Sequence, residues 1–153
     1  MNKLIKPIAT VGALIIICTL LFGGRSAEKT ASKFMKSLME ADAKEAYSLM
    51  SDELKESLPY ETKKVAIHSM QENFDDAIEG YKDIYGKRWK YKVHVIDVYE
   101  CEAISDEYEG RKMMKAEIEV THKGSGLLNK KEGSDSDTLY LVKDGRNWYV
   151  ADF

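Results

Sequence analysis

The spacing of the apolar residues changes at Gly86, and this change constrains the fold more than any other feature of the sequence. Before Gly86, apolar residues recur every three or four positions, which is the period of an amphipathic helix. After Gly86 they alternate with polar residues, which is the period of a strand with one buried face. This order predicts an α+β domain in which helices pack on an antiparallel sheet.

We expect about three helices before Gly86. Asp42, followed three residues later by Glu45, is a capping box that begins the second of them, and Ser51 can cap a further short turn. The longest helix should cover residues 61–85. Its apolar stripe, which we interpret as core, consists of Ile67, Met70, Phe74, Ile78, Tyr81 and Tyr85.

About four strands should follow Gly86, in a bent antiparallel sheet. The alternation of the first strand shifts by one position at Ile96, as in a β-bulge that bends a strand. If Asp144 and Gly145 form a two-residue turn, Leu141 faces Trp148 and Leu139 faces Val150. This register places the last strand in the core.

The polar, glycine-rich residues 123–137 resemble a long mobile hairpin loop. Glu132, Asp135 and Asp137 lie in this segment, but their spacing is not that of a calcium-binding loop. The chain also has no Cys-x-x-Cys pair and no cluster of histidine and cysteine. We therefore expect neither a metal ion nor a cofactor.

The first 26 residues predict a membrane anchor. Residues 7–24 carry no charge and would form a helix of roughly 27 Å, enough to cross a bilayer core. Lys3 and Lys6 precede this run, so a short N-terminal stretch should stay in the cytoplasm and residues 27–153 should lie outside, as a single-pass protein of the cell membrane. A cleaved leader, giving a secreted protein, and a buried core helix are the alternatives; Ile17 before Cys18 disfavours a lipoprotein.

The charge of the remaining chain excludes one class of partner. From Ala27 onward, 26 acidic residues outnumber 20 basic ones, because three of the 23 lysines and arginines come earlier. A domain this acidic lacks the basic surface of a nucleic-acid binder. We expect no nucleic-acid partner.

Two segments resemble a known superfamily: FMKSLMEADAKEAYSLMSDELKES, beginning at Phe34, and YLVKDGRNWYVADF, beginning at Tyr140. They are similar to the opening helices and final hairpin of exported bacterial members of the nuclear transport factor 2-like (cystatin-like) superfamily, which includes ketosteroid isomerase and the SnoaL-type cyclases. The likeness covers roughly residues 31–153. It implies a cone-shaped domain. It carries no catalytic motif, and members of the superfamily serve as enzymes, binders and scaffolds.

We interpret the protein as a non-catalytic binding domain for a partner protein or a small apolar ligand. The expected lining of the cone's open end is Trp89, Tyr91, Met114, His122 and Trp148, with residues 123–137 as a lid. Two alternatives stay open. One is an assembly subunit of an envelope-spanning secretion or transfer machine, since inner-membrane components of type IV secretion systems resemble this layout.

The other alternative is an exported acid–base enzyme of the ketosteroid isomerase-like type. His122 would then be the base and Tyr91 the hydrogen-bond donor, with Asp97 beside the bulge as a further candidate. We expect His122 to lie at the rim, where water would prevent tuning of its pKa. The sequence leaves the oligomeric state open.

Overall fold

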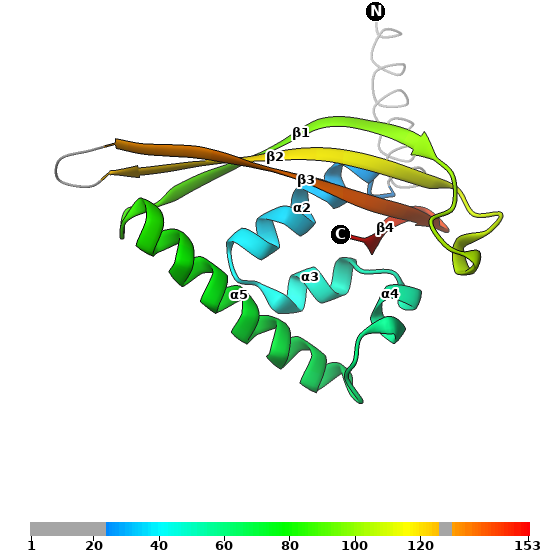
Figure 1. Cartoon of the computed structure of the whole chain (residues 1–153). Helices are drawn as coiled ribbons and strands as arrows, with labels where there is room; N and C mark the ends of the chain where they lie inside the picture. Colours follow the sequence, from blue (N-terminus) through cyan, green and yellow to red (C-terminus); the bar gives the residue numbers. More distant parts are fainter. Residues whose placement is uncertain (1–23, 126–129) are drawn as a thin grey trace, which may run out of the picture.

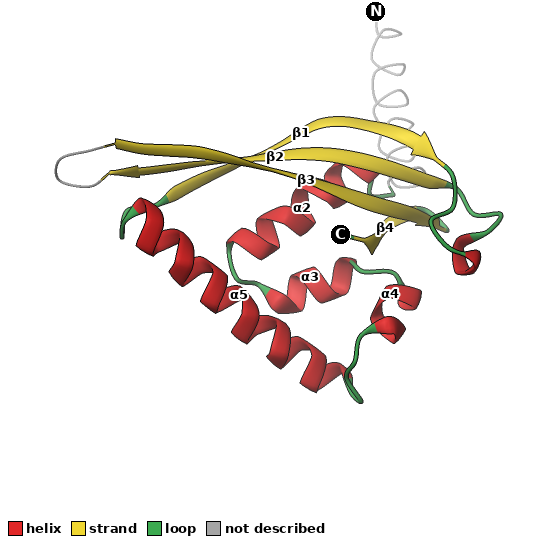
Figure 2. Cartoon of the chain, viewed as in Figure 1, coloured by secondary structure: helices red, strands yellow, loops and turns green. Residues whose placement is uncertain are grey.

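The structure, a computed structural model, describes residues 24–125 and 130–153, and these form an α+β domain (Figure 1). All four described α-helices lie on one side of the sheet, which is antiparallel with the strand order β1-β2-β3-β4 (Figure 2). The helices are α2 (Ala27–Met39), α3 (Ala43–Leu49), α4 (Asp52–Ser57) and α5 (Lys63–Tyr85). The strands are β1 (Lys90–Cys101), β2 (Met113–Ser125), β3 (Lys130–Asp144) and β4 (Asn147–Asp152), with a short 3₁₀ turn at Asp106–Tyr108. The prediction of an α+β domain with helices packed on a four-stranded antiparallel sheet is confirmed.

Each described helix begins at a polar residue whose side chain accepts a hydrogen bond from the first turn. Asp42 and Ser51 do so at α3 and α4, as the sequence predicts, and Ser26 and Thr62 do so at α2 and α5. At the other end of α5, Gly86 adopts φ 92°, a value that glycine accepts without strain. Its N–H donates to the carbonyl of Lys82 at 2.7 Å, which ends the helix.

The β-bulge predicted in the first strand is present. The β1–β2 register shifts between Val95 and Asp97, so Ile96 is the extra residue and is 61% exposed. Val95 and Val98 on either side both pack on the core. The bulge therefore keeps the apolar face of β1 inward although the sequence alternation is broken.

Residues 123–137 are not a long loop, which corrects the expectation from sequence. β2 continues to Ser125 and β3 begins at Lys130, so the ladder pairs Lys123 with Glu132. Ladder hydrogen bonds join backbone groups, so polar side chains and glycines did not prevent pairing here.

The register predicted for the last hairpin is also wrong, by two residues. Leu141 pairs with Val150 and Lys143 pairs with Trp148, and Asp144 and Asn147 close the turn. Gly145, at φ 55°, takes the first position of the two-residue turn instead of the second. Because the shift is even, Leu141 and Val150 still face the core, and both are fully buried.

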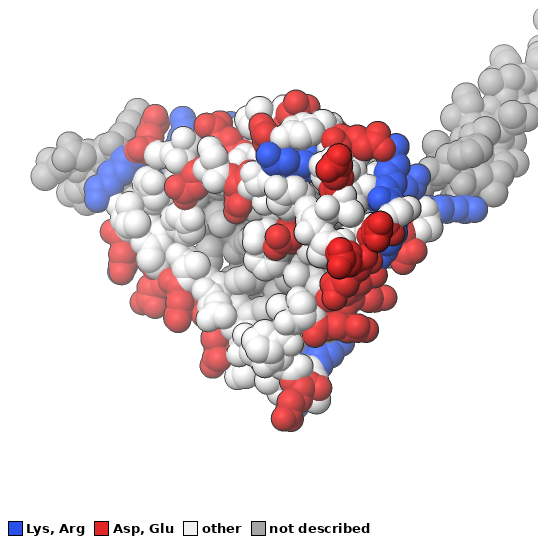
Figure 3. Space-filling model, turned by 45° about the vertical axis from the view of Figure 1, so that its right-hand side comes forward, with Lys and Arg blue, Asp and Glu red and all other residues white. Residues whose placement is uncertain are grey.

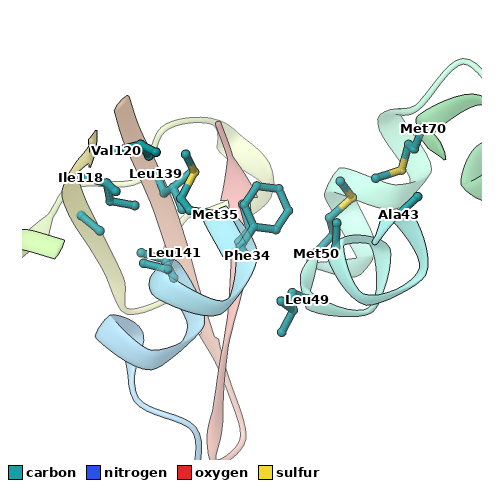
Figure 4. Close-up of a cluster of buried hydrophobic side chains, with 14 residues drawn as sticks. Phe34, Met35, Ala43, Leu49, Met50, Met70, Ile118, Val120, Leu139 and Leu141 are labelled. Carbon is teal, nitrogen blue, oxygen red and sulfur yellow. The ribbon is translucent and has the colours of Figure 1, made fainter. Parts of the chain in front are cut away.

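The main core lies between α2, α3 and the concave face of the sheet. Phe34 of α2 is fully buried and lies between the strand side chains and α3 (Figure 4). Residues 50 and 51 close the outer edge of β4: Met50 forms a parallel bridge with Val150, and the Ser51 N–H donates to the Val150 carbonyl at 2.7 Å. The core comprises Ala31, Phe34, Met35, Ala43, Ala46, Leu49, Met50, Met70, Ala116, Ile118, Val120, Leu139, Leu141 and Val150.

No helix within residues 24–125 and 130–153 is long and apolar enough to cross a membrane. The anchor expected over residues 7–24 lies, apart from Gly24, outside the described residues. It stays a prediction.

Candidate functional site

The candidate site lies where the end of α5 meets the far ends of β2 and β3 (Figure 1). Two glycines on these strands permit the approach. A Cβ on Gly124 would lie 1.8 Å from the Tyr85 carbonyl oxygen, and one on Gly133 would lie 2.3 Å from the Tyr85 hydroxyl. A side chain at position 124 would push the backbone of α5 off the sheet, and one at position 133 would displace the Tyr85 ring.

Five rings gather at this junction, and we call them the aromatic cluster: Tyr81, Tyr85, Trp89, Tyr91 and His122. The Tyr81 ring stacks on the His122 ring with centroids 4.5 Å apart, and on the Trp89 ring at 5.1 Å. Tyr85 lies 5.3 Å from His122. The cluster joins α5, the start of β1 and the end of β2, with the rings of Tyr81, Trp89 and His122 near parallel.

His122 is fully buried, which corrects the expectation that it lies at the rim. The C-terminal turns of α5 cover this part of β2. The Trp89 indole N–H donates to His122 Nδ1 at 3.1 Å, and because an indole can only donate, Nδ1 must carry the lone pair. The proton of the neutral ring is therefore on Nε2.

The Nε2 atom of His122 faces the carboxylate of Asp135. The distance from Nε2 to Asp135 Oδ2 is 3.0 Å, but the two groups lack the alignment of a hydrogen bond, so Nε2 has no hydrogen-bond partner. The Tyr81 hydroxyl donates to the same Oδ2 at 3.0 Å. Burial, and then this carboxylate, raise the pKa of Tyr81 to about 12. The phenol thus stays protonated and donating.

A second phenol–carboxylate pair lies beside the cluster. The Tyr91 hydroxyl donates to Glu40 Oε1 at 2.6 Å, joining β1 to the end of α2. Burial and the Glu40 carboxylate raise the pKa of Tyr91 well above its usual value. Glu40 itself is exposed, so solvent or a ligand can reach this pair.

The structure brings together three of the five expected lining residues. Trp89, Tyr91 and His122 belong to the aromatic cluster. Met114 is half-buried and precedes His122 by eight positions on β2, or roughly 26 Å along an extended strand. Trp148 packs on the main core from β4. These two do not adjoin the cluster.

Sequence reasoning missed four residues of this site: Glu40, Tyr81, Tyr85 and Asp135. The periodicity of α5 predicts the two tyrosines only as the end of a core stripe. Two aromatic residues four positions apart on a helix are neighbours, and this spacing could have indicated an aromatic contact site. The polar composition of residues 123–137 places Asp135 in a predicted loop. Asp97, considered for the enzyme alternative, is exposed and accepts a hydrogen bond from the Val98 N–H at 2.8 Å, away from the cluster.

A hollow adjoins the cluster on the concave side. Figure 3 shows the surface indented between the sheet and α5, with walls that are mainly uncharged. Half-buried apolar side chains of three elements pack at the margin of the main core: Leu38 and Met39 of α2, Phe74 of α5, and Tyr91 and Val93 of β1. Ile78 lies one helical turn after Phe74 and is also half-buried.

The chemistry available here is mainly apolar contact with a few hydrogen bonds. His122 Nε2 is buried beneath Tyr81 and Tyr85, so a substrate could meet it only if α5 moved. Within the part of the chain that the structure describes, no three histidine, cysteine, aspartate or glutamate side chains gather as metal ligands.

A separate cleft of about 250 Å³ beside α4 is polar and contains the ion pair of Arg111 with Glu53. Burial opposes ionisation of Glu53, but hydrogen bonds and Arg111 outweigh it, so the pKa of this carboxyl is lowered. The pair is already satisfied, and the residues that line the cleft are mainly polar or charged.

No protein-family model matches the sequence, and no curated protein matches it either. Function must therefore be argued from the site itself.

Proposed function

We propose that this chain is a non-catalytic binding domain of the nuclear transport factor 2-like cone type, held outside the cell membrane by residues 7–24. Its ligand site is the hollow between α5 and the concave face of the sheet. The ligand is a small apolar molecule or an apolar segment of a partner protein.

One observation carries this proposal: the apolar stripe of α5 is only partly covered along its second half. Only Ala66 and Met70 of this 23-residue helix are buried. Phe74, Ile78 and Tyr81 continue the stripe but are only half-buried. When a ligand removes half-buried apolar side chains of a concave surface from water, the change in free energy favours binding.

The polar groups at the hollow suit orientation of a ligand better than catalysis. Tyr91 and Tyr81 are held protonated by burial and by their carboxylate partners. The one buried imidazole has its Nδ1 lone pair occupied by Trp89. A general base needs a free lone pair within reach of the substrate, and His122 has none.

The test compares two isoleucines of the same helix in a deletion strain that produces the full chain. Ile78 lies on the apolar stripe of α5 and is half-buried, whereas Ile84 is 55% exposed. We expect Ile78→Glu to abolish complementation and Ile84→Glu to preserve it, with both variants present in the membrane fraction at equal levels. Complementation by both variants would contradict the proposed site.

Glu40 beside Tyr91 is the observation that favours the acid–base enzyme as a second candidate. Glu40→Gln combined with Tyr91→Phe keeps the shape of the hollow and removes the phenol–carboxylate pair of Tyr91 and Glu40. Near-complete complementation by this double variant supports binding. Loss of function in a folded, membrane-located double variant would favour the enzyme.

A further inference from the structure

The chain enters the described domain through a tightly packed junction. Gly24 is the first described residue, and a Cβ built on it would lie 1.7 Å from the carbonyl oxygen of Arg146. The backbone N–H of the next residue, Arg25, donates to Asn147 Oδ1 at 3.0 Å. The first two residues are therefore already packed on the turn between β3 and β4.

The Arg25 side chain fixes the same junction to two elements. Its Nε donates to Thr30 Oγ1 of α2 at 3.0 Å, and its Nη2 donates to the Trp148 carbonyl of β4 at 3.2 Å. The guanidinium also lies over the Tyr149 ring, 5.4 Å from its centroid. Because Thr30 is fully buried, this anchorage reaches into the folded domain.

From Gly24 onward, the chain has no length in which a flexible connection could form. Ser26 is the N-cap of α2, so only three described residues precede the helix, which begins at Ala27. Even fully extended, three residues span roughly 10 Å. A headgroup layer is of similar thickness, about 5–8 Å on each side of the bilayer core.

We infer that the β3–β4 turn is a membrane-contacting surface that lies among the phospholipid headgroups and holds the domain in one orientation. This inference rests on the proposed function, because it requires that residues 7–24 span the bilayer. Given that anchor, the packing of Gly24 and Arg25 on residues 146–149 leaves the turn no other location.

The orientation has a consequence for the hollow. Asp135, at the aromatic cluster, and Asp144, at the turn, are nine positions apart on β3, or roughly 30 Å. In the orientation that we infer, β3 runs outward from the lipid, so the cluster and the end of α5 face the aqueous phase and the ligand reaches this site from solution.

Geometry, more than charge, places the turn at the membrane. Lys112, Lys143 and Arg146 are exposed at this end of the sheet, but so are Asp144 and Asp152. Figure 3 shows lysines and arginines beside the point where the described chain begins, with acidic side chains close by. Mixed charges attract anionic lipids weakly, so contact should persist at high salt.

The experiment measures depth by fluorescence quenching on the full chain in vesicles of phosphatidylcholine and phosphatidylglycerol. Cys18 and Cys101 are replaced by serine, and a fluorophore is attached at Lys143→Cys in the turn or at Glu79→Cys on the exposed side of α5. Lipids with a nitroxide on the headgroup should quench the label at 143 several-fold more than the label at 79, and high salt should not change the ratio. Equal quenching, or stronger quenching at 79, would overturn the inference.

An inserted spacer tests whether the junction, or lipid binding by the turn itself, holds the domain in its orientation. A Gly-Ser insertion of about six residues between Gly23 and Gly24 supplies a flexible connection, and it should remove the difference between the two labels. A difference that survives the insertion would show that the turn binds lipid by itself and would overturn the role of the junction. Failure of the chain to float with vesicles contradicts the anchor, whereas floating with equal quenching contradicts only the fixed orientation.

Discussion

The helices α2 and α5 carry similar apolar stripes on the same side of the sheet, yet they are buried to very different depths. α2 has 13 residues and buries six of them, including Phe34 and Met35. α5 has 23 residues and buries two. A periodic stripe thus identifies the face of a helix that meets the domain, but not whether that face is filled by core or left for a ligand. The four predictions that follow test this difference.

The largest effect should come from the buried helix. Phe34→Ala removes a fully buried ring that also makes an edge contact with Phe153, and should lower the free energy of unfolding by about 3–5 kcal/mol. Ile78→Ala on α5 should cost about 1 kcal/mol or less, because its side chain is half-exposed. Urea unfolding of the full chain in detergent micelles measures both. Equal losses would mean that the two helices contribute alike to the core.

Contact between α5 and the sheet can be broken at one glycine. Gly124→Ala places a methyl group against the Tyr85 backbone, and should destabilise the domain by up to about 3 kcal/mol. Hydrogen exchange should show the last turns of α5 losing protection first. Gly80→Ala is the matched control: its Cβ meets open space within α5, so it should stabilise the helix by about 0.5–1 kcal/mol. If the Tyr85 amide exchanges as slowly in Gly124→Ala as in the original chain, the close packing of α5 on the sheet is disproved.

The hydrogen bond between Trp89 and His122 should have a smaller effect. Trp89→Phe keeps a ring in the cluster but leaves the buried His122 Nδ1 without its donor, at a cost of about 1–2 kcal/mol. The double variant Trp89→Phe with His122→Leu removes both polar partners and should recover part of that loss. A thermodynamic cycle from urea unfolding measures the coupling. Simple additivity of the two changes would show that the bond contributes nothing.

The smallest effect on stability should appear at alkaline pH and concerns Tyr81. Its pKa is raised to about 12, so the neutral phenol is favoured in the folded state. The stability gained is complete below pH 10, the pKa of an unfolded tyrosine, and is lost as the pH rises towards 12. We expect about 1 kcal/mol or less, because the group is partly exposed and solvent screens it. Tyr81→Phe should flatten the stability profile above pH 10; an unchanged slope would argue against the Asp135 contact.

Local signals in the sequence predicted the local features well. The caps at Asp42 and Ser51 and the bulge at Ile96 each depend on a few neighbouring residues, and all three are present. Alternation also placed Met114 and His122 on the same face of β2. Their spacing of eight positions already implies roughly 26 Å along an extended strand. Alternation defines only the face of a strand, so it could not say which partner covers each position.

The failures at the candidate site involve contacts between segments far apart in the chain, whereas the register error at Asp144 and Gly145 is local. His122 is buried because Tyr81 and Tyr85 cover it, and these residues lie about 40 positions earlier in the chain. The strand pairing of residues 130–137 depends on backbone bonds to β2, which side-chain polarity does not report. The sequence therefore predicts Asp135 as a solvated loop residue, although its carboxylate accepts a hydrogen bond from the Tyr81 hydroxyl.

The contact of residues 50 and 51 with β4 has a consequence for solubility. An unpaired strand edge is a template on which other chains can add, and it is a common start of aggregation. β4 is a short edge strand, and Val150 is fully buried within it. The Ser51 N–H donates to the Val150 carbonyl, so this carbonyl is not free to pair with another chain. On the opposite side of the sheet, the bulge at Ile96 and the side chains of Lys90 and Lys92 make β1 a poor template. Copies of this domain can therefore stay separate at high local concentration.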